Sequence, residues 1–317
     1  MLSYEQIMPY IHGAVQIKKA DNFYSFSRFT DKQQRVIAAR GLGPRENYTS
    51  GMRLEFRTNG GKLSFEYRAV KGISVDFLSV EITINAVPCY HKYETDFAPT
   101  GKIALEIEHS AEQVEVIVYF PNLQQFEIKN VDLPEDSVPV IKSKKLLILG
   151  DSITYGSVAT HPHLTYANLV ADALGAELLC QGVGGDTFCE DNLDEALAFH
   201  PDIITVAYGT NDWVSGTLTL DHVTKYLKKL TTLNPDSEIY VLLPIWRSNE
   251  DEICNNMTLA DGRNLIRRAA EQFPHINVID CSNFVPKVSE YFWDDCLHPN
   301  DLGFLYYAKA LLNKIKK

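Results

Sequence analysis

The first half of the chain alternates apolar and polar residues with a period of two. Between residues 23 and 131, apolar side chains occupy every second position at 52–56 and again at 63–67, and an Asn-Gly-Gly sequence separates the two runs. This alternation is typical of strands with one buried and one solvated face, and adjacent glycines allow the positive backbone dihedrals of a tight turn. The pattern predicts a β-hairpin over residues 52–67.

The same alternation recurs at residues 103–107 and 114–118, with no convincing helical pattern between the strands. Several short alternating strands favour two antiparallel sheets packed face to face. We therefore predict an antiparallel, jelly-roll-like β-sandwich domain at residues 1–138. The predicted domain ends at a polar link, residues 133–139, which contains two prolines.

After this link the period changes to that of a helix. Between residues 166 and 174 the apolar residues follow i, i+3, i+4, i+7 spacing, and Gly175 stands where a helix cap is expected. Unbroken apolar runs then alternate with helical patterns, which favours a parallel sheet covered by helices on both faces. We predict an α/β domain at residues 139–317. Its strands are expected near 146–149, 178–180, 203–207, 239–243 and 278–279, and its helices near 166–174, 192–199, 223–230, 259–270 and 304–315.

Length and charge narrow the classes of function. A chain of 317 residues most often holds two domains, because single cores stop growing near roughly 250 to 300 residues. The formal charge of −11 argues against nucleic acid and anionic membranes as partners. The N-terminal sequence lacks the features of a secretory signal, and no apolar run reaches membrane-spanning length, so we expect a cytoplasmic protein. Six scattered cysteines are expected to be free thiols.

Four short polar sequences lie where predicted strands end or the last helix begins. GDSIT contains Ser152, GVGGDT contains Gly185, GTND contains Asn211, and DCLHP contains Asp295 and His298. The carboxyl ends of parallel strands meet at one edge of a sheet, so these residues are expected to lie together.

Their chemistry is complementary. A serine hydroxyl needs an imidazole to take its proton, and the imidazole needs a carboxylate to hold its tautomer. Asp295 and His298 are three residues apart and can face each other in one turn. The backbone N–H groups of Ser152 and Gly185, with the Asn211 amide, would supply three donors to an oxyanion. Taken singly, each sequence also fits a cap or a turn.

Together the four sequences resemble the conserved blocks of the SGNH subgroup of GDSL esterases and lipases. The resemblance covers residues 144–317 and implies a three-layer, flavodoxin-like SGNH hydrolase domain. It implies that Ser152 is the nucleophile, His298 the base and Asp295 its orienting carboxylate, and that Gly185 and Asn211 complete the oxyanion hole. Many members carry Asn where this chain has Cys180.

A β-sandwich followed by such a domain is also similar to bacterial two-domain carbohydrate esterases, which remove acetyl groups from sugars. This looser resemblance rests on domain order and on residues 50–54. It implies a carbohydrate O-deacetylase with a small-molecule or oligosaccharide ester as substrate. A lipase, acylhydrolase or thioesterase remains an alternative, although the link around Ser137 and residues 248–251 are too polar for an apolar lid. A second alternative is a non-catalytic carbohydrate-binding protein with the same fold. The absence of a GxSxG sequence argues against an α/β-hydrolase.

Three aromatic residues lie next to these sequences and are candidates for the substrate pocket: Trp213, Tyr155 and Trp293. The mechanism needs no cofactor and no metal. His161 and His163, two residues apart in a proline-bearing loop, do not by themselves predict a metal site. The sequence leaves the oligomeric state open, and also whether the sandwich binds substrate or only caps the site.

Overall fold

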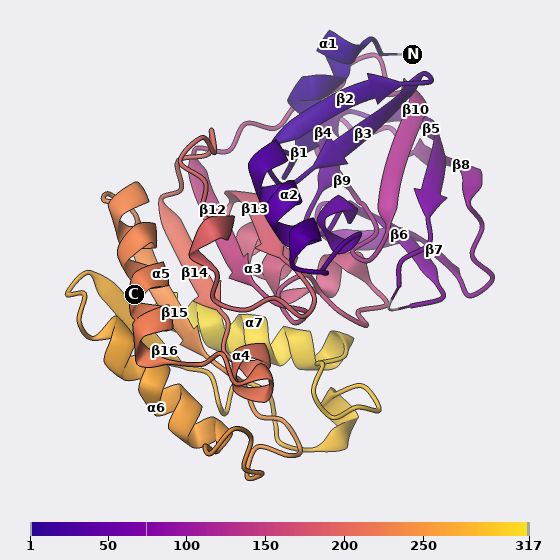
Figure 1. The fold of residues 1–317 in the computed structure, drawn as a ribbon. Coiled ribbons are helices and arrows are strands. Elements are labelled where there is room, and N and C mark those ends of the chain that lie inside the picture. Colours follow the sequence, from indigo (N-terminus) through magenta and orange to yellow (C-terminus); the bar gives the residue numbers. More distant parts are fainter. Residues whose placement is uncertain (1, 74, 316–317) are drawn as a thin grey trace.

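The computed structural model describes residues 2–73 and 75–315. Figure 1 shows a part built from antiparallel strands, indigo to magenta, beside a part with a central parallel sheet flanked by helices, mostly orange and yellow. Both predicted architectures, a β-sandwich domain and a flavodoxin-like α/β domain, are confirmed. Within the described ranges, no helix combines the length and the apolar character that crossing a bilayer requires.

Two antiparallel sheets form the sandwich domain, and their facing side chains make one apolar core. The first sheet has the order β1 (Ile11–His12), β4 (Arg53–Thr58), β9 (Val114–Tyr119), β6 (Leu78–Ile84) and β7 (Val87–Glu94), with β11 (Val138–Pro139) paired to β4. The second has the order β2 (Gln16–Ala20), β3 (Phe23–Ser27), β10 (Gln125–Asp132), β5 (Gly61–Val70) and β8 (Thr100–Ile107). The predicted boundary between residues 138 and 139 falls inside β11.

The hairpin predicted over residues 52–67 is wrong, because β4 and β5 belong to different sheets. β4 pairs with β9, whereas β5 pairs with β8 and β10. Gly60 (φ +129°) and Gly61 (φ +119°) carry the chain across the sandwich instead. Alternation indicates which side chains face the core, but pairing within a sheet and packing across two sheets satisfy it equally well.

A helix that the alternation did not predict lies within the sandwich half. α2 (Asp31–Ala39) begins at a capping box, in which Thr30 and Gln33 each accept a hydrogen bond from the other's backbone N–H. Its sequence, DKQQRVIAA, has little apolar character, and Gln33 and Ile37 are its buried residues. α2 therefore lacks the apolar stripe that marks a helix in a sequence. Shorter helical segments in this half are α1 (Tyr4–Ile7), η1 (Met8–Tyr10) and η2 (Arg45–Asn47).

The parallel sheet has the strand order β13, β12, β14, β15, β16, which is the doubly wound order 2-1-3-4-5. α3 and α7 pack on one face, and α5 and α6 pack on the other. The strands are β12 (Lys144–Gly150), β13 (Ala176–Gly182), β14 (Ile203–Ala207), β15 (Glu238–Leu243) and β16 (Ile276–Asp280). The helices are α3 (Tyr166–Leu174), α4 (Thr210–Ser215), α5 (Leu220–Leu233), α6 (Leu259–Ala270) and α7 (Asp301–Ile315), with the short segments η3 (Pro162–Leu164), η4 (Glu190–Asn192) and η5 (Ser289–Tyr291).

The helix predicted near residues 192–199 is wrong, since only η4 forms there and irregular chain follows it. This segment is held by polar contacts to the sandwich domain. Thr30 Oγ1 donates to Asp194 Oδ2 at 2.6 Å, and Gln33 Nε2 donates to the carbonyl of Asn192 at 2.8 Å. Docking against α2 thus replaces the helical hydrogen bonds that the leucine spacing suggested.

A buried arginine joins the two domains. The Arg28 side chain, 0% exposed, donates to the carbonyls of Cys180 (2.6 Å) and Gly182 (2.9 Å) at the end of β13. It also donates to the carbonyls of Tyr48 (2.7 Å) and Arg45 (3.2 Å) in its own domain. These bonds tie the sandwich to the strand that leads into the GVGGDT loop.

Candidate active site

The four motif sequences meet at the carboxyl edge of the parallel sheet. Ser152 follows β12, Gly185 follows β13, Asn211 lies at the start of α4 after β14, and His298 precedes α7. All four line one cleft, open to solvent, of about 1100 Å³. The remaining lining residues are Arg45, Tyr155, Ser157, Val158, Gly184, Trp293, Asp294, Asp295 and Leu297.

Ser152, His298 and Asp295 form a continuous hydrogen-bonded chain. His298 Nε2 lies 2.8 Å from Ser152 Oγ, and His298 Nδ1 lies 2.5 Å from Asp295 Oδ2. The other carboxylate oxygen, Oδ1, accepts the backbone N–H groups of Leu297 (2.9 Å) and His298 (3.0 Å). Burial disfavours ionisation of Asp295, but these hydrogen bonds outweigh it and lower its pKa to about 2. The carboxylate therefore fixes Nδ1–H, so that Nε2 can accept the serine proton.

The turn after β12 positions Ser152. A Cβ at Gly150 would lie 2.1 Å from Thr154 Oγ1, so a residue with a side chain at this position would clash with the turn. The Ser157 N–H donates to the Ser152 carbonyl at 2.9 Å, and Asp151 Oδ1 accepts the Ile153 N–H at 3.0 Å. Cys180 supports the same turn by donating its thiol to the Thr154 carbonyl at 3.5 Å.

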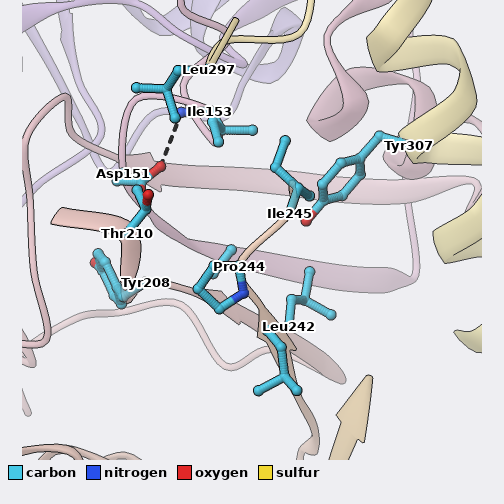
Figure 2. Close-up of a pocket in the computed structure, with 11 residues that line it drawn as sticks. Asp151, Ile153, Tyr208, Thr210, Leu242, Pro244, Ile245, Leu297 and Tyr307 are labelled. Atoms are coloured by element: carbon cyan, nitrogen blue, oxygen red, sulfur yellow. Dashed lines mark hydrogen bonds between the residues drawn. The ribbon is translucent and has the colours of Figure 1, made fainter. Parts of the chain in front are cut away.

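Asp151 faces away from the cleft, into the interior behind the nucleophile strand. Figure 2 shows it hydrogen-bonded to Ile153 at a cavity also lined by Ile245 and Tyr307. Burial in these surroundings raises the pKa of Asp151 to about 7, although the Ile153 N–H opposes the shift. The residue therefore serves the turn mainly as a desolvated hydrogen-bond acceptor, and Leu297 lines both its cavity and the cleft.

The three residues predicted to donate to an oxyanion, Ser152, Gly185 and Asn211, all line the cleft. In the described part of the chain, no acceptor engages the backbone N–H of Ser152 or of Gly185. Gly185 has φ +81°, which a side chain would strain. The Asn211 amide is oriented by a hydrogen bond from Nδ2 to the Asp186 carbonyl at 3.0 Å, which leaves its second hydrogen for a ligand.

The sandwich domain braces this loop and shapes one wall of the cleft. Arg40 pairs with the buried Asp186 carboxylate and donates to Thr187 Oγ1 at 2.6 Å. Burial raises the pKa of Asp186, and the Arg40 charge opposes that shift. Arg45 lines the cleft itself, and Tyr48 stacks on Tyr155 with ring centroids 6.2 Å apart. Sequence reasoning missed both arginines, because they follow a polar helix that only its Thr30 capping box signals.

Two of the three candidate aromatics line the cleft. Tyr155 does so from the turn after Ser152, and Trp293, 45% exposed, does so from the loop before His298. The prediction for Trp213 is wrong: its ring is fully buried and Nε1 donates to the Met257 carbonyl at 2.8 Å. Residues two apart on a helix point in nearly opposite directions, so α4 turns Trp213 into the core when Asn211 faces the cleft. The possible metal ligands Glu81, His91 and His161 are not among the residues that line this cleft.

Comparison with known proteins agrees with this architecture. Residues 148–304 match the family model described as the GDSL-like lipase/acylhydrolase family. No curated protein matches the chain by sequence.

Several solved structures share the fold over both domains. A salicylyl-acyltransferase, SsfX3, from a tetracycline biosynthetic pathway has 20% identity and a TM-score of 0.80, covering 96% of this chain and 93% of that one. A family two carbohydrate esterase from Clostridium thermocellum, in complex with cellohexaose, has 14% identity and a TM-score of 0.63, covering 85% and 93%. An acetyl xylan esterase from Butyrivibrio proteoclasticus has 17% identity and a TM-score of 0.61, covering 94% and 96%. At such identities the likeness establishes the fold alone.

Proposed function

We propose that the protein is a serine esterase that uses Ser152, His298 and Asp295 as a catalytic triad. The match of residues 148–304 to the GDSL-like lipase/acylhydrolase family model supports an ester hydrolase. The observation that carries the proposal is the hydrogen-bonded chain from Ser152 Oγ through both ring nitrogens of His298 to Asp295. The neighbouring donors of Gly185 and Asn211 supply the second requirement of acyl transfer, a site for the oxyanion.

The reaction follows from this arrangement. His298 Nε2 takes the proton of Ser152 as Oγ attacks the ester carbonyl, and Asp295 stabilises the imidazolium that forms. The carbonyl oxygen, now negative, receives hydrogen bonds from the Ser152 and Gly185 backbone and from Asn211. Collapse of this intermediate breaks the bond to the leaving alcohol, which takes the proton from His298. Water, deprotonated by His298, then attacks the acyl-enzyme carbonyl. The acid is released, and Ser152 takes back a proton from His298.

The proposed substrate is an O-acetylated sugar, either small or oligomeric. The cleft is open and carries polar groups on several sides, among them Arg45, Ser157 and Asp294. The exposed indole of Trp293 gives a flat surface of the kind on which sugar rings pack. The fold shared with a carbohydrate esterase in complex with cellohexaose and with an acetyl xylan esterase supports the same substrate class.

The catalytic proposal is tested by replacing the nucleophile. We expect Ser152→Ala to abolish hydrolysis of p-nitrophenyl acetate while its thermal unfolding matches that of the native chain. Undiminished turnover would reject Ser152 as the nucleophile. Absence of esterase activity in the native chain, together with glycan binding that survives the substitution, would instead support a carbohydrate-binding protein.

The substrate class needs a separate test. We expect acetate release from acetylated xylo- or cello-oligosaccharides, and a decline in kcat/KM from acetyl to dodecanoyl p-nitrophenyl esters. A preference for long acyl chains or for thioesters would overturn the sugar assignment in favour of a lipase or thioesterase, and would leave the triad assignment intact.

A further inference from the structure

Four ionisable side chains from both domains gather away from the cleft lining. Glu81 on β6 and His91 on β7 are directly paired across the first sheet of the sandwich. His161 and His163 lie opposite them, in the loop of the α/β domain between the Ser152 turn and α3. One ligand atom from each of Glu81, His91 and His161 lies within 4.8 Å of the others.

The Glu81 carboxylate is the centre of this group. It is 1% exposed, and both of its oxygens are in hydrogen-bonding contact with histidine rings, those of His161 and His163. His163 Nδ1 lies 2.5 Å from Oε2, and His161 Nδ1 lies 3.1 Å from Oε1. His163 thus fixes one carboxylate oxygen and orients the other toward His161.

The surrounding contacts hold the rings and the loop that carries His161. Ser79 Oγ contacts His91 Nε2 at 2.9 Å and donates to the Thr160 carbonyl at 2.6 Å, and the rings of His91 and His161 are 4.2 Å apart. Asp301 accepts the backbone N–H of Thr160 at 3.0 Å, which places a second carboxylate beside this loop.

We propose that Glu81, His91 and His161 bind one divalent transition-metal ion, of which zinc fits the donor set best, and that His163 is a positioning residue for Glu81. Two imidazole nitrogens and one carboxylate oxygen are a ligand set that zinc uses in proteins, with water in the fourth position. The imidazoles argue against calcium and magnesium, which prefer oxygen ligands throughout. Carboxylates that bind a metal are usually hydrogen-bonded by an outer residue, and His163 makes such a contact to Glu81.

The location gives the ion a structural role. Its ligands come from both domains, so binding would join the sandwich to the loop that follows the Ser152 turn. Ser157 and Val158, in the same loop, line the cleft. This proposal is independent of the esterase assignment, because it uses none of the residues placed in the triad or the oxyanion hole.

The test measures metal binding by the full chain after removal of metal with a chelator. Calorimetric titration with zinc chloride is expected to show one ion bound per chain, and the thermal unfolding temperature is expected to rise on addition of zinc but not of calcium. His91→Ala and His161→Ala should each weaken zinc binding at least about 100-fold and cancel the thermal shift. His163→Ala should weaken it about 10-fold, as loss of an outer-sphere partner does.

The controls separate this site from adventitious binding by other groups. His275→Ala, on the exposed surface, should bind zinc as the native chain does. Because His91 is exposed and His161 is partly exposed, their variants should stay folded, and circular dichroism of the metal-free proteins checks this. No zinc binding by the native chain, or equal affinity in folded His91→Ala or His161→Ala, would overturn the proposal and leave a hydrogen-bonded interface cluster.

Discussion

Asn211 offers the sharpest test of the proposed oxyanion site, because its amide group has one hydrogen for the Asp186 carbonyl and a second for the substrate. Asn211 Nδ2 donates one hydrogen to the Asp186 carbonyl at 3.0 Å and leaves the other for the substrate oxyanion. Asn211→Ala removes one of three donors, each worth about 3 kcal/mol, so kcat should fall by about 10² to 10³. KM should change little, since the lost interaction strengthens only as charge develops on the carbonyl oxygen.

The assay is steady-state hydrolysis of p-nitrophenyl acetate, with Asn192→Ala as the matched control. Asn192 Nδ2 also donates to Asp186, at Oδ2 and 3.1 Å, but Asn192 does not line the cleft. The control variant should therefore lose loop support while keeping kcat within about tenfold of the native value. A drop of less than tenfold in Asn211→Ala, or an equal drop in Asn192→Ala, would refute the assignment of Asn211 as an oxyanion donor.

Three further predictions concern stability and substrate binding. The pKa of Asp151 is raised to about 7 in the folded state and is about 3.9 in the unfolded state. The folded state therefore binds the Asp151 proton more tightly, and the free energy of unfolding falls as pH rises from 4 to 7. Asp151→Asn should remove this fall, gaining stability relative to the native chain by a few kcal/mol between pH 4 and pH 8. Urea unfolding across that range checks it, and a constant difference would contradict it. Arg28→Met should cost at least about 3 kcal/mol in urea unfolding, because three buried carbonyls and one partly buried carbonyl lose their donor. A cost below about 1 kcal/mol would show that water replaces the guanidinium. Trp293→Ala should raise KM for acetylated oligosaccharides about fivefold while leaving p-nitrophenyl acetate hydrolysis within about twofold, and equal effects on both would contradict sugar stacking.

The α/β half could be predicted from sequence because its signals are local. Unbroken apolar strands such as 146–149 are buried on both faces, and that alone favours a parallel sheet under two helical layers. In a parallel sheet, the residues that follow each strand lie at the same carboxyl edge. The structure does bring Ser152, Gly185, Asn211 and His298 to one cleft.

What could not be predicted depends on partners distant in sequence. Alternation around residues 59–61 does not say whether two strands pair or face each other across a sandwich. α2 is stabilised by polar contacts to the other domain, so it carries no apolar stripe. The cluster around Glu81 needs His91 from a neighbouring strand and His161 from the other domain. Trp213 follows the GTND sequence closely but lies in the core, because residues two positions apart on a helix point in nearly opposite directions.

We propose that His298 activates Ser152 as a nucleophile within this cleft. Reaction with a fluorophosphonate, followed by peptide mass spectrometry, tests it most directly, because the reagent bonds only to an activated hydroxyl. We expect one adduct per chain, on Ser152, absent from Ser152→Ala and formed at least about 10²-fold more slowly in His298→Ala. An adduct on another residue, or one on Ser152 that forms equally fast without His298, would contradict it.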